Sequence, residues 1–358
     1  MSTDNPPELS IIVPVFEEAR RIAPLLESLA GQRACRFEVI FCDGGSGDET
    51  VSKVVERGAQ YPFAVHLLET PRGRGRQMNA AADTALGDFL LFLHADSRFS
   101  DRQALRRGLD CMRQKVNAIG SDAVAGRFAL RFGENRTKES FGYFFYACKA
   151  RLTRRGCIHG DQGFMLPRVF FHRLDGFDER LPFLEDENLA KKVFQQGCWL
   201  LFPTEIETSA RRFEREGLRE RQTLNALIMN FHDIGWQEFL AEAPGLYRSQ
   251  IHTERLDLAP FFSEISRMLQ DYPASRRRRL WYATGAYVRS QAWQIPYMLH
   301  VVQRFRRGQP PAAGWGGPGR WQDLFDRLTD NRIGNWVTAG LVQFWFAFNR
   351  LRFRCRRK

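Results

Sequence analysis

The sequence predicts an α/β protein with a mostly parallel, Rossmann-like sheet, and two observations support this prediction. Short apolar runs alternate with runs of helical periodicity through about the first hundred residues. Polar residues gather directly after the apolar runs, where parallel strands would end. This alternation is typical of a sheet with helices on both faces, which binds ligands at the carboxyl ends of its strands.

The amino-terminal elements follow from apolar periodicity. Strands are expected at 9–16, 37–42, 65–69 and 89–96, because these runs are short and apolar. Helices are expected between them at 17–31, 49–58 and 77–86. The polar groups at the strand ends are Glu17-Glu18, Asp43, the loop 72–76 and His94-Ala95-Asp96. Their convergence on one edge of the sheet is the strongest functional signal in the residues themselves.

The later part of the chain gives weaker patterns. Helices are expected at 101–117 and 184–197, strands at 124–132 and 199–203, and a loop that enters a short strand at 159–167. Beyond about residue 250, helices are separated by a Pro/Gly-rich linker at 308–320. We therefore divide the chain into an α/β domain at 1–250 and a helical extension at 251–358.

The bulk composition separates these parts and indicates a compartment. The 358-residue chain has a net charge of +12, and residues 276–358 contain 17 Lys and Arg against 3 Asp and Glu. The seven cysteines include no C-x-x-C pair, which argues against a zinc ribbon or a disulfide framework. The amino terminus shows no secretory signal, so a reducing cytosol is the expected compartment.

Two segments at the sheet edge have the chemistry of a bound diphosphate. Asp96 ends an apolar run and suits Mg²⁺ or Mn²⁺, with His94 as a second ligand or a neighbour. The alternative is that Asp96 only caps the next helix. The loop 72–76 interleaves arginines with glycines, which favours diphosphate binding over a solvated basic loop. No G-x-G-x-x-G or Walker pattern is present, so binding of NAD or a P-loop nucleotide is not expected.

Two further positions offer carboxylates. Asp43 ends the second strand and could accept hydrogen bonds from a base or ribose. Glu185 and Asp186 open a helix, whose dipole keeps a carboxylate ionised. Such a group can take the proton of an attacking hydroxyl, although an ordinary acidic helix start has the same spacing.

Taken together, six motifs resemble one family. SIIVPVFEE, VIFCDGGSGDET, PRGRGRQMNAAADTALGDFLLFLHADS, GDQGFML, GFDERLPFLEDENLAKKV and TSARRFER occur in that order over residues 9–247. They resemble family 2 glycosyltransferases with the GT-A fold, and most of all the bacterial subgroup labelled arsenosugar-biosynthesis glycosyltransferases. The resemblance implies an inverting transfer from a nucleoside-diphosphate sugar.

The resemblance also assigns roles to individual residues. On the donor side it places Pro14, Val15, Glu18, Asp43, Arg72, Arg76, Asn79, Ala95 and Arg212, the last followed by Phe213. Asp96 matches the metal aspartate, with His94 beside it, and Asp186 matches the general base, next to Glu185. Gly160, Asp161 and Gln162 match the acceptor-side loop. The sequence departs from the usual pattern at His94, Ser97, Gly44 and Glu17, which leaves the identity of the metal and of the preferred nucleotide base open.

The extension lies outside the resemblance. Its last apolar run, 333–348, has 16 residues, fewer than the roughly 20 that a spanning helix needs. Aromatic residues followed by arginines favour a helix in the interface of an anionic membrane. The alternatives are a packed helical subdomain with solvated arginines and a nucleic-acid-binding tail.

We therefore expect a metal-dependent, inverting glycosyltransferase, peripheral on the cytoplasmic face of a membrane. Its acceptor is expected to be a hydroxyl compound, free or lipid-linked. The sequence leaves the sugar, the base and the acceptor open. The rival readings are another nucleotide-sugar-dependent transferase and a non-catalytic nucleotide-binding adaptor with a basic tail.

Overall fold

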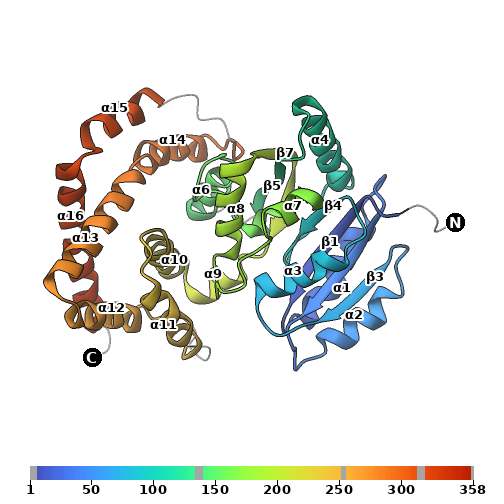
Figure 1. Cartoon of the computed structure of the whole chain (residues 1–358), viewed down its shortest axis with the longest axis horizontal. Coiled ribbons are helices and arrows are strands. Elements are labelled where there is room, and N and C mark those ends of the chain that lie inside the picture. Colours follow the sequence, from blue (N-terminus) through green and yellow to red (C-terminus); the bar gives the residue numbers. More distant parts are fainter. Residues whose placement is uncertain (1–5, 134–139, 251–254, 313–318, 356–358) are drawn as a thin grey trace. The chain divides into compact units, whose positions relative to one another are not determined.

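The chain forms two compact units: the first comprises Met1–Ser209 with Pro311–Ala313, and the second Ala210–Pro310 with Gly314–Lys358. The structure, a computed structural model, describes residues 6–133, 140–250, 255–312 and 319–355 (Figure 1). Part of the predicted linker at 308–320 lies outside these ranges. The predicted domain boundary at residue 250 comes from the extent of the family resemblance, and it stays a prediction.

The first unit contains a seven-stranded sheet in the order β3-β2-β1-β4-β6-β5-β7. Its strands are β1 (Leu9–Val15), β2 (Phe37–Asp43), β3 (Val65–Glu69), β4 (Phe89–Phe92), β5 (Val124–Phe132), β6 (Phe164–Pro167) and β7 (Cys198–Thr208). β6 alone runs antiparallel, against both β4 and β5, while every other pairing is parallel. The predicted α/β class with a mostly parallel sheet is confirmed.

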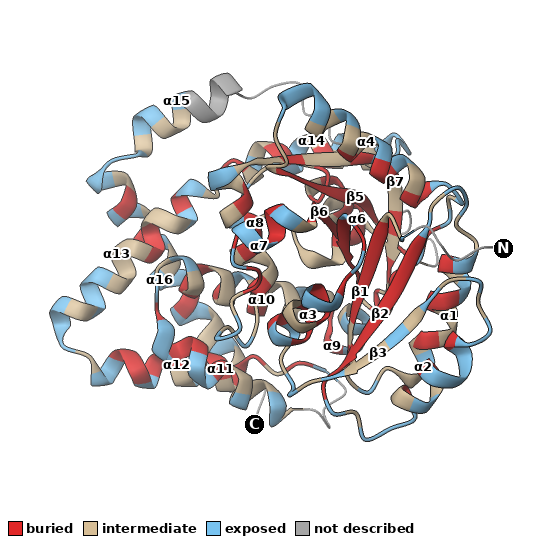
Figure 2. Cartoon of the chain, turned by 45° about the vertical axis from the view of Figure 1, so that its right-hand side comes forward, coloured by how far each residue is buried: buried red, intermediate tan, exposed pale blue. Residues whose placement is uncertain are grey.

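Helices cover both faces of this sheet. They are α1 (Ala19–Ala30), α2 (Thr50–Gly58), α3 (Arg74–Thr84), α4 (Ala104–Ile119), α6 (Phe141–Lys149), α7 (Arg168–Arg173) and α8 (Glu185–Gln196). Ile12 and Leu90 on one face pack with Met78 of α3. On the other face, Met165 and Phe202 lie against Gly108 of α4. Because both faces are covered, β1, β2 and β4 are mostly apolar and almost fully buried, and Figure 2 shows β1 and β2 buried.

The strand boundaries correct one inference from the sequence. The fourth strand was expected at 89–96, so that His94 and Asp96 would point to the same side of a strand. β4 ends at Phe92, and the next residues form a turn in which the Ser97 N–H donates to the His94 carbonyl at 3.1 Å. Strand alternation therefore does not determine where these two side chains point. β7, in turn, extends to Thr208, well past the predicted end at 203.

The second unit is helical in its described residues, as the prediction of a helical extension required. Its helices are α9 (Arg211–Glu216), α10 (Leu218–Asp233), α11 (Gln237–Arg248), α12 (Ala259–Asp271), α13 (Ala274–Ser290), α14 (Gln294–Arg306), α15 (Gly319–Thr329) and α16 (Arg332–Cys355). α13 and α16 pack closely because Gly285 has no side chain: a Cβ there would lie 2.2 Å from the Asn335 carbonyl oxygen. Within the described ranges, no helix is both long and apolar enough to cross a bilayer.

Candidate active site

The carboxyl ends of β1 and β2 are tied together by a residue that the sequence did not single out. The side-chain amide of Gln77, buried on α3, donates to the Val15 carbonyl at 2.9 Å and to the Cys42 carbonyl at 2.7 Å. The Val15 carbonyl also accepts the Gly44 N–H at 3.0 Å, so the end of β1 is bonded both to α3 and to the loop after β2. Gln77 thereby fixes the spacing of Pro14-Val15 and Asp43 at the edge.

Asp43 shapes its own turn. Its carboxylate accepts the N–H groups of Gly45 and Ser46, both at 2.8 Å, and the Ser46 hydroxyl at 2.5 Å. Ser46 in turn accepts the Glu17 N–H, while Thr50 accepts the Glu18 N–H at 2.9 Å. The loop after β1 is therefore held against the loop after β2. The expected contact of Asp43 with a base or ribose stays a prediction.

The arginine loop begins α3 and brings positive charge to the same edge. The Arg72 guanidinium lies 3.8 Å from the Phe16 ring centroid, and Arg74 pairs with Glu185 at 2.6 Å. Arg76 pairs with Glu179 at 3.4 Å. The helix begins here with no side chain capping its first N–H groups, so the positive end of its dipole adds to these charges. The arrangement suits a phosphate group.

Asn79 anchors this helix to the segment before α8. Its side-chain amide donates to the Phe177 carbonyl at 2.9 Å and to Glu179 at 3.0 Å, and its oxygen accepts the Phe177 N–H. All three polar positions of the amide are thus used by the protein. Its predicted contact with the donor stays a prediction, whereas its structural role in joining distant segments is direct.

Asp186 meets the predicted acceptor-side loop. Its carboxylate accepts the Gly160 N–H at 2.7 Å and the Glu187 N–H at 2.9 Å. Gly160 brings a third residue close, since a Cβ there would lie 3.2 Å from Asp186 Oδ2 and 3.4 Å from His94 Nε2. Residues 94, 160 and 186, which are far apart in sequence, therefore share one site. A side chain at position 160 would fill the space between the two functional groups.

The charges at this site divide the carboxyls into two kinds. Burial raises the pKa of Asp186, whereas the charge of Arg74 and the hydrogen bond from the Gly160 N–H lower it. The lowering effects are larger, so the pKa of Asp186 lies below its ordinary value. Asp161 behaves in the opposite way, because burial and the nearby Asp186 raise its pKa to about 7. Carboxyls with pKa values pushed apart are typical of acid–base sites. Asp186 is the carboxyl of this pair whose pKa is lowered, so it is the ionised member.

Glu185 is the buried partner in this cluster. Burial raises its pKa, while the ion pair with Arg74 acts against that increase. Because its carboxylate is paired with the Arg74 guanidinium, Glu185 holds Arg74 in place beside Asp186. In the sequence Arg74 is only one arginine of the loop 72–76, and the 111 residues between the two partners give no signal of the pair.

Two residues with a strained backbone conformation directly precede site residues. Glu17, before Glu18, has φ of 55°, and Leu184, before Glu185, has φ of 65°. Residues other than glycine rarely adopt this left-handed conformation, and it concentrates at functional sites. In both cases the strained residue turns the chain from a loop into the first turn of a helix at the sheet edge.

Asp161 and Gln162 complete the acceptor-side loop. Gln162 is fully buried and donates its amide to the Cys157 carbonyl at 2.9 Å, so it supports the loop from within. Asp161 Oδ1 is buried and, within the described part of the chain, has no hydrogen-bond partner. An unsatisfied carboxylate oxygen near the charge of Asp96 fits a site that receives a cation or a proton.

The candidate metal ligands are of the kind that a hard divalent cation accepts. No three or more His, Cys, Asp and Glu residues in the described ranges form a group that could hold a metal by themselves. Mg²⁺ and Mn²⁺ need fewer, because they take one or two carboxylates and fill the remaining positions with phosphate oxygens and water. Asp96, with His94 beside Asp186, offers such a partial set.

Arg212 and Phe213 belong to α9 of the second unit. The first unit forms the cluster described above by itself. The predicted contact of Arg212 with the donor therefore stays a prediction.

Comparison with known proteins finds one family model that matches this part of the chain. Residues 10–172 match the model of the family described as Glycosyl transferase family 2. An uncharacterized glycosyltransferase of Haemophilus influenzae is 41% identical over 196 residues, 52% of this chain and 62% of that protein. A PGL/p-HBAD biosynthesis glycosyltransferase of Mycobacterium bovis is 34% identical over 103 residues, 28% of this chain and 40% of that protein. The alignments thus span less than two thirds of either curated relative.

Solved structures also resemble the chain. The mannosyltransferase PcManGT from Pyrobaculum calidifontis, in complex with GDP-Man and Mn²⁺, has 20% identity and a TM-score of 0.48, over 96% of this chain and 88% of that chain. S. aureus TarS 1–349 in complex with UDP-GlcNAc has 18% identity and a TM-score of 0.44, over 87% of this chain and 98% of that chain.

The sheet and its edge define an α/β protein with an acid–arginine site at the carboxyl ends of parallel strands. Residues 10–172, less than half of the chain, match the model of Glycosyl transferase family 2, and they carry most of this sheet edge.

Proposed function

We propose that the protein is an inverting glycosyltransferase that uses a nucleoside-diphosphate sugar and Asp186 as general base. The observation that carries this proposal is the state of Asp186: charged, oriented by the Gly160 N–H, and placed at the sheet edge beside Arg74. The acceptor oxygen attacks the anomeric carbon as the bond from that carbon to the diphosphate oxygen breaks. Asp186 takes the acceptor proton. The neighbouring carboxylate, Glu185, has a different role from this base, because it forms an ion pair with Arg74.

The donor lies, in this proposal, along the edge from β1 to β4. Pro14, Val15, Glu18 and Asp43 border the nucleoside, and Arg72, Arg76 and Asn79 border the diphosphate together with Ala95. The positive start of α3 supports the placement of the diphosphate, because it combines a free helix N-terminus with three arginines. The arginines hold and orient the leaving group, which shortens the search for a reactive geometry.

Asp96 and His94 would hold the divalent metal, Mg²⁺ or Mn²⁺. When bound, such an ion neutralises charge that develops on the leaving diphosphate. Within this chain, burial and the nearby carboxylates of Asp186 and Asp96 raise the pKa of Asp161 to about 7, so this carboxyl is partly protonated near neutral pH.

The acceptor is proposed to be a hydroxyl compound that lies against Gly160, Asp161 and Gln162. The missing side chain at Gly160 supports this, since a Cβ there would crowd Asp186 Oδ2 at 3.2 Å and His94 Nε2 at 3.4 Å. The finer likeness, to the arsenosugar-biosynthesis subgroup, rests on the sequence motifs, and the relatives reported above do not bear that name. We further propose a peripheral location on the cytoplasmic face of a membrane, through the extension.

Calorimetric titration tests the donor site. The full-length protein is titrated with UDP and with GDP, each with and without Mn²⁺, and compared with Asp96→Ala. We expect one nucleotide to bind in the micromolar range only with Mn²⁺, and at least about tenfold more weakly in Asp96→Ala, because a metal ligand is lost. Asp110→Ala, which removes a carboxylate from the surface of α4, is the matched control. Failure of both nucleotides to bind under all conditions would contradict the proposed function.

A further inference from the structure

Helix α16 has one face that packs and one that does not. On the inner face Asn335, Ala339 and Phe346 are buried. Phe346 stacks with Phe262 of α12 at 5.0 Å between ring centroids, and Trp281 of α13 meets it edge-on at 5.8 Å. The inner face thus has its own core, and the outer face is not needed to hold the helix in the second unit.

The outer face carries an exposed apolar stripe. We define the α16 stripe as Ile333, Val337, Leu341, Phe344, Phe348 and Leu351, spaced at helical intervals of three or four. Ile333 is 77% exposed, Leu341 66% and Phe344 75%. Between 333 and 352, the exposed positions include only two polar residues, Gln343 and Arg352. The stripe is about 27 Å long, from the rise of an α-helix.

This pattern is the reverse of an ordinary surface helix, which turns its charged residues outward. A continuous apolar face of this size on a folded unit marks an interaction surface. Two tryptophans, Trp336 and Trp345, flank the stripe and are themselves exposed. Trp prefers the boundary between apolar and polar surroundings, as at a lipid headgroup layer.

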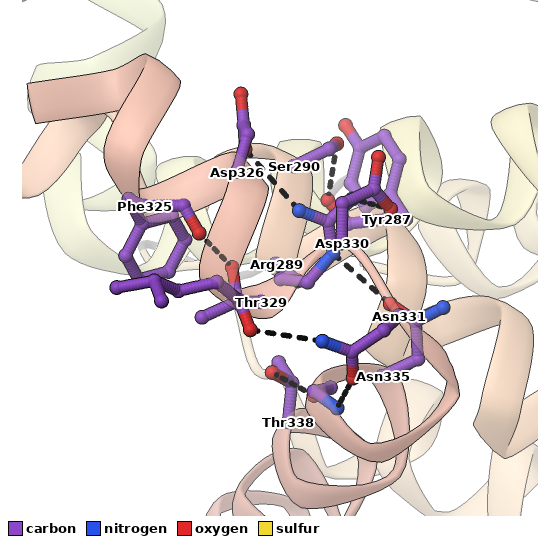
Figure 3. Close-up of polar contacts among 12 residues, drawn as sticks. Tyr287, Arg289, Ser290, Phe325, Asp326, Thr329, Asp330, Asn331, Asn335 and Thr338 are labelled. Atoms are coloured by element: carbon purple, nitrogen blue, oxygen red, sulfur yellow. Dashed lines mark hydrogen bonds and ion pairs between the residues drawn. The ribbon is translucent and has the colours of Figure 1, made fainter. Parts of the chain in front are cut away.

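A buried arginine holds the helices that present the stripe. Figure 3 shows Arg289 of α13 directed at Asp326 of α15, at Asp330 and at Asn335 of α16. The distances are 3.2 Å to Asp326, 2.6 Å to Asp330 and 3.0 Å to Asn335. Asn335 also donates to the Tyr282 hydroxyl at 3.1 Å. This network fixes α13, α15 and the start of α16 to one another, so the stripe is presented by a rigid element.

Positive charge gathers at one end of the stripe. α13 and α16 run antiparallel, since Arg289 meets Asn335 while Trp281 meets Phe346. The exposed arginines at 277–279, which begin α13, therefore lie toward the carboxyl half of α16, where Arg350 and Arg352 stand. Four more cations follow in the sequence, at 354 and 356–358, beyond the side chains that the structure describes. An apolar row that ends in such a cluster is complementary to an anionic lipid surface.

We propose that α16 lies in the plane of an anionic bilayer interface, with the α16 stripe inserted among the acyl chains and the arginines at the headgroups. The inference deepens the membrane location proposed above, and it rests on none of the transferase chemistry. A second copy of this chain is the other occupant that an apolar face could take. Pairing two stripes would bring two strongly basic extensions together, which disfavours that arrangement.

Vesicle sedimentation of the full-length protein tests the surface. The probes are phosphatidylcholine vesicles with and without phosphatidylglycerol, at low and high salt. We expect the protein to partition onto the anionic vesicles, less so at high salt, with a blue shift of tryptophan emission. Leu341→Glu/Phe344→Glu should weaken partitioning about a hundredfold, because two large apolar side chains no longer insert. Val55→Glu, at an apolar residue on α2 that is 61% exposed, should bind as the wild type does.

Three results would contradict the surface proposal. One is vesicle binding by Leu341→Glu/Phe344→Glu that equals the wild type, and another is a wild-type protein that stays in the supernatant with anionic vesicles at low salt. The third is a dimer of the wild type that the double substitution converts to monomer while vesicle binding is absent. Titration with UDP and GDP separates the two proposals, because the double variant should bind nucleotide normally whether or not it binds vesicles.

Discussion

The two units distribute charge and apolar surface in opposite ways. The first unit buries its apolar residues in a sheet covered on both faces and gathers carboxylates at the edge, where Glu185 is buried against Arg74. The second unit buries an arginine, Arg289, among polar partners and leaves a row of aromatic and aliphatic side chains in solvent. A site for chemistry needs charged groups shielded from water, whereas a site for attachment needs apolar groups exposed to it.

The largest expected effect comes from a substitution in the first unit that slows catalysis and leaves the second unit unchanged. Asp186→Asn should lower the rate of sugar transfer about a thousandfold, because the acceptor hydroxyl loses its base. Nucleotide binding and vesicle binding should stay at wild-type values. Turnover is measured with the nucleotide sugar whose nucleotide binds in calorimetry.

Glu185→Gln is the matched control, one residue away on the same turn of α8. We expect it to reduce the rate only about tenfold, since Glu185 positions Arg74 and does not touch the reacting atoms. A larger loss in Glu185→Gln than in Asp186→Asn would transfer the role of base to Glu185.

The second unit should be sensitive at Arg289. Arg289→Met should destabilise this unit by about 2 kcal/mol, because Asn335 loses a buried partner and two aspartates lose their cation. Urea unfolding of the full-length protein, followed by tryptophan fluorescence, measures the change. Arg327→Met, on the exposed side of α15, should alter the free energy of unfolding by less than about 0.5 kcal/mol. Equal effects of the two substitutions would show that the network does not hold the helices.

The smallest effect is a pH dependence of the first unit. The folded protein binds a proton on Asp161 more tightly than the unfolded chain does, since the folded pKa is about 7 and the ordinary value 3.8. Stability therefore falls as pH rises from about 4 to about 7. Asp161→Asn should remove this loss and be more stable than the wild type at pH above 7, by roughly 1–2 kcal/mol.

Asp178→Asn provides the opposite sign. The hydrogen bonds from Arg180 lower the pKa of Asp178 to about 2, so its contribution is present above the ordinary pKa and is lost as pH falls through the folded value. The substitution should slightly destabilise the protein at neutral pH, by about 0.5 kcal/mol for a pair at the surface. A gain in stability at high pH in Asp178→Asn, or none in Asp161→Asn, would contradict the assignment of charges.

The fold was predictable because its signals are local. Apolar periodicity located β1, β2 and β3 to within a residue or so, and the polar groups after the strands indicated the edge that gathers the site. The reversal of β6 and the end of β4 at Phe92 depend on pairing between distant strands, which periodicity does not contain. Expecting His94 and Asp96 within a strand was wrong for this reason.

The sequence pointed to some of the residues that the structure brings together, but not to most of the contacts between them. The sequence indicated Asp186 and the loop at 160–162, and the structure joins them through one N–H. It gave no signal of Gln77 as a bridge between two strand ends or of Arg74 as the partner of Glu185, since these depend on three-dimensional proximity. In the extension, composition showed an aromatic, basic run, but only packing shows which side of α16 remains uncovered.

The stereochemistry of donor hydrolysis tests the central claim most directly. Glycosyltransferases can pass the sugar to water, so proton NMR can follow the anomer released from an α-linked nucleotide sugar in the presence of Mn²⁺, with no acceptor required. The account predicts that the β anomer appears first, and that Asp186→Asn releases it about a thousandfold more slowly. Release of the α anomer first, or unchanged release by Asp186→Asn, would contradict an inverting transfer with Asp186 as its base.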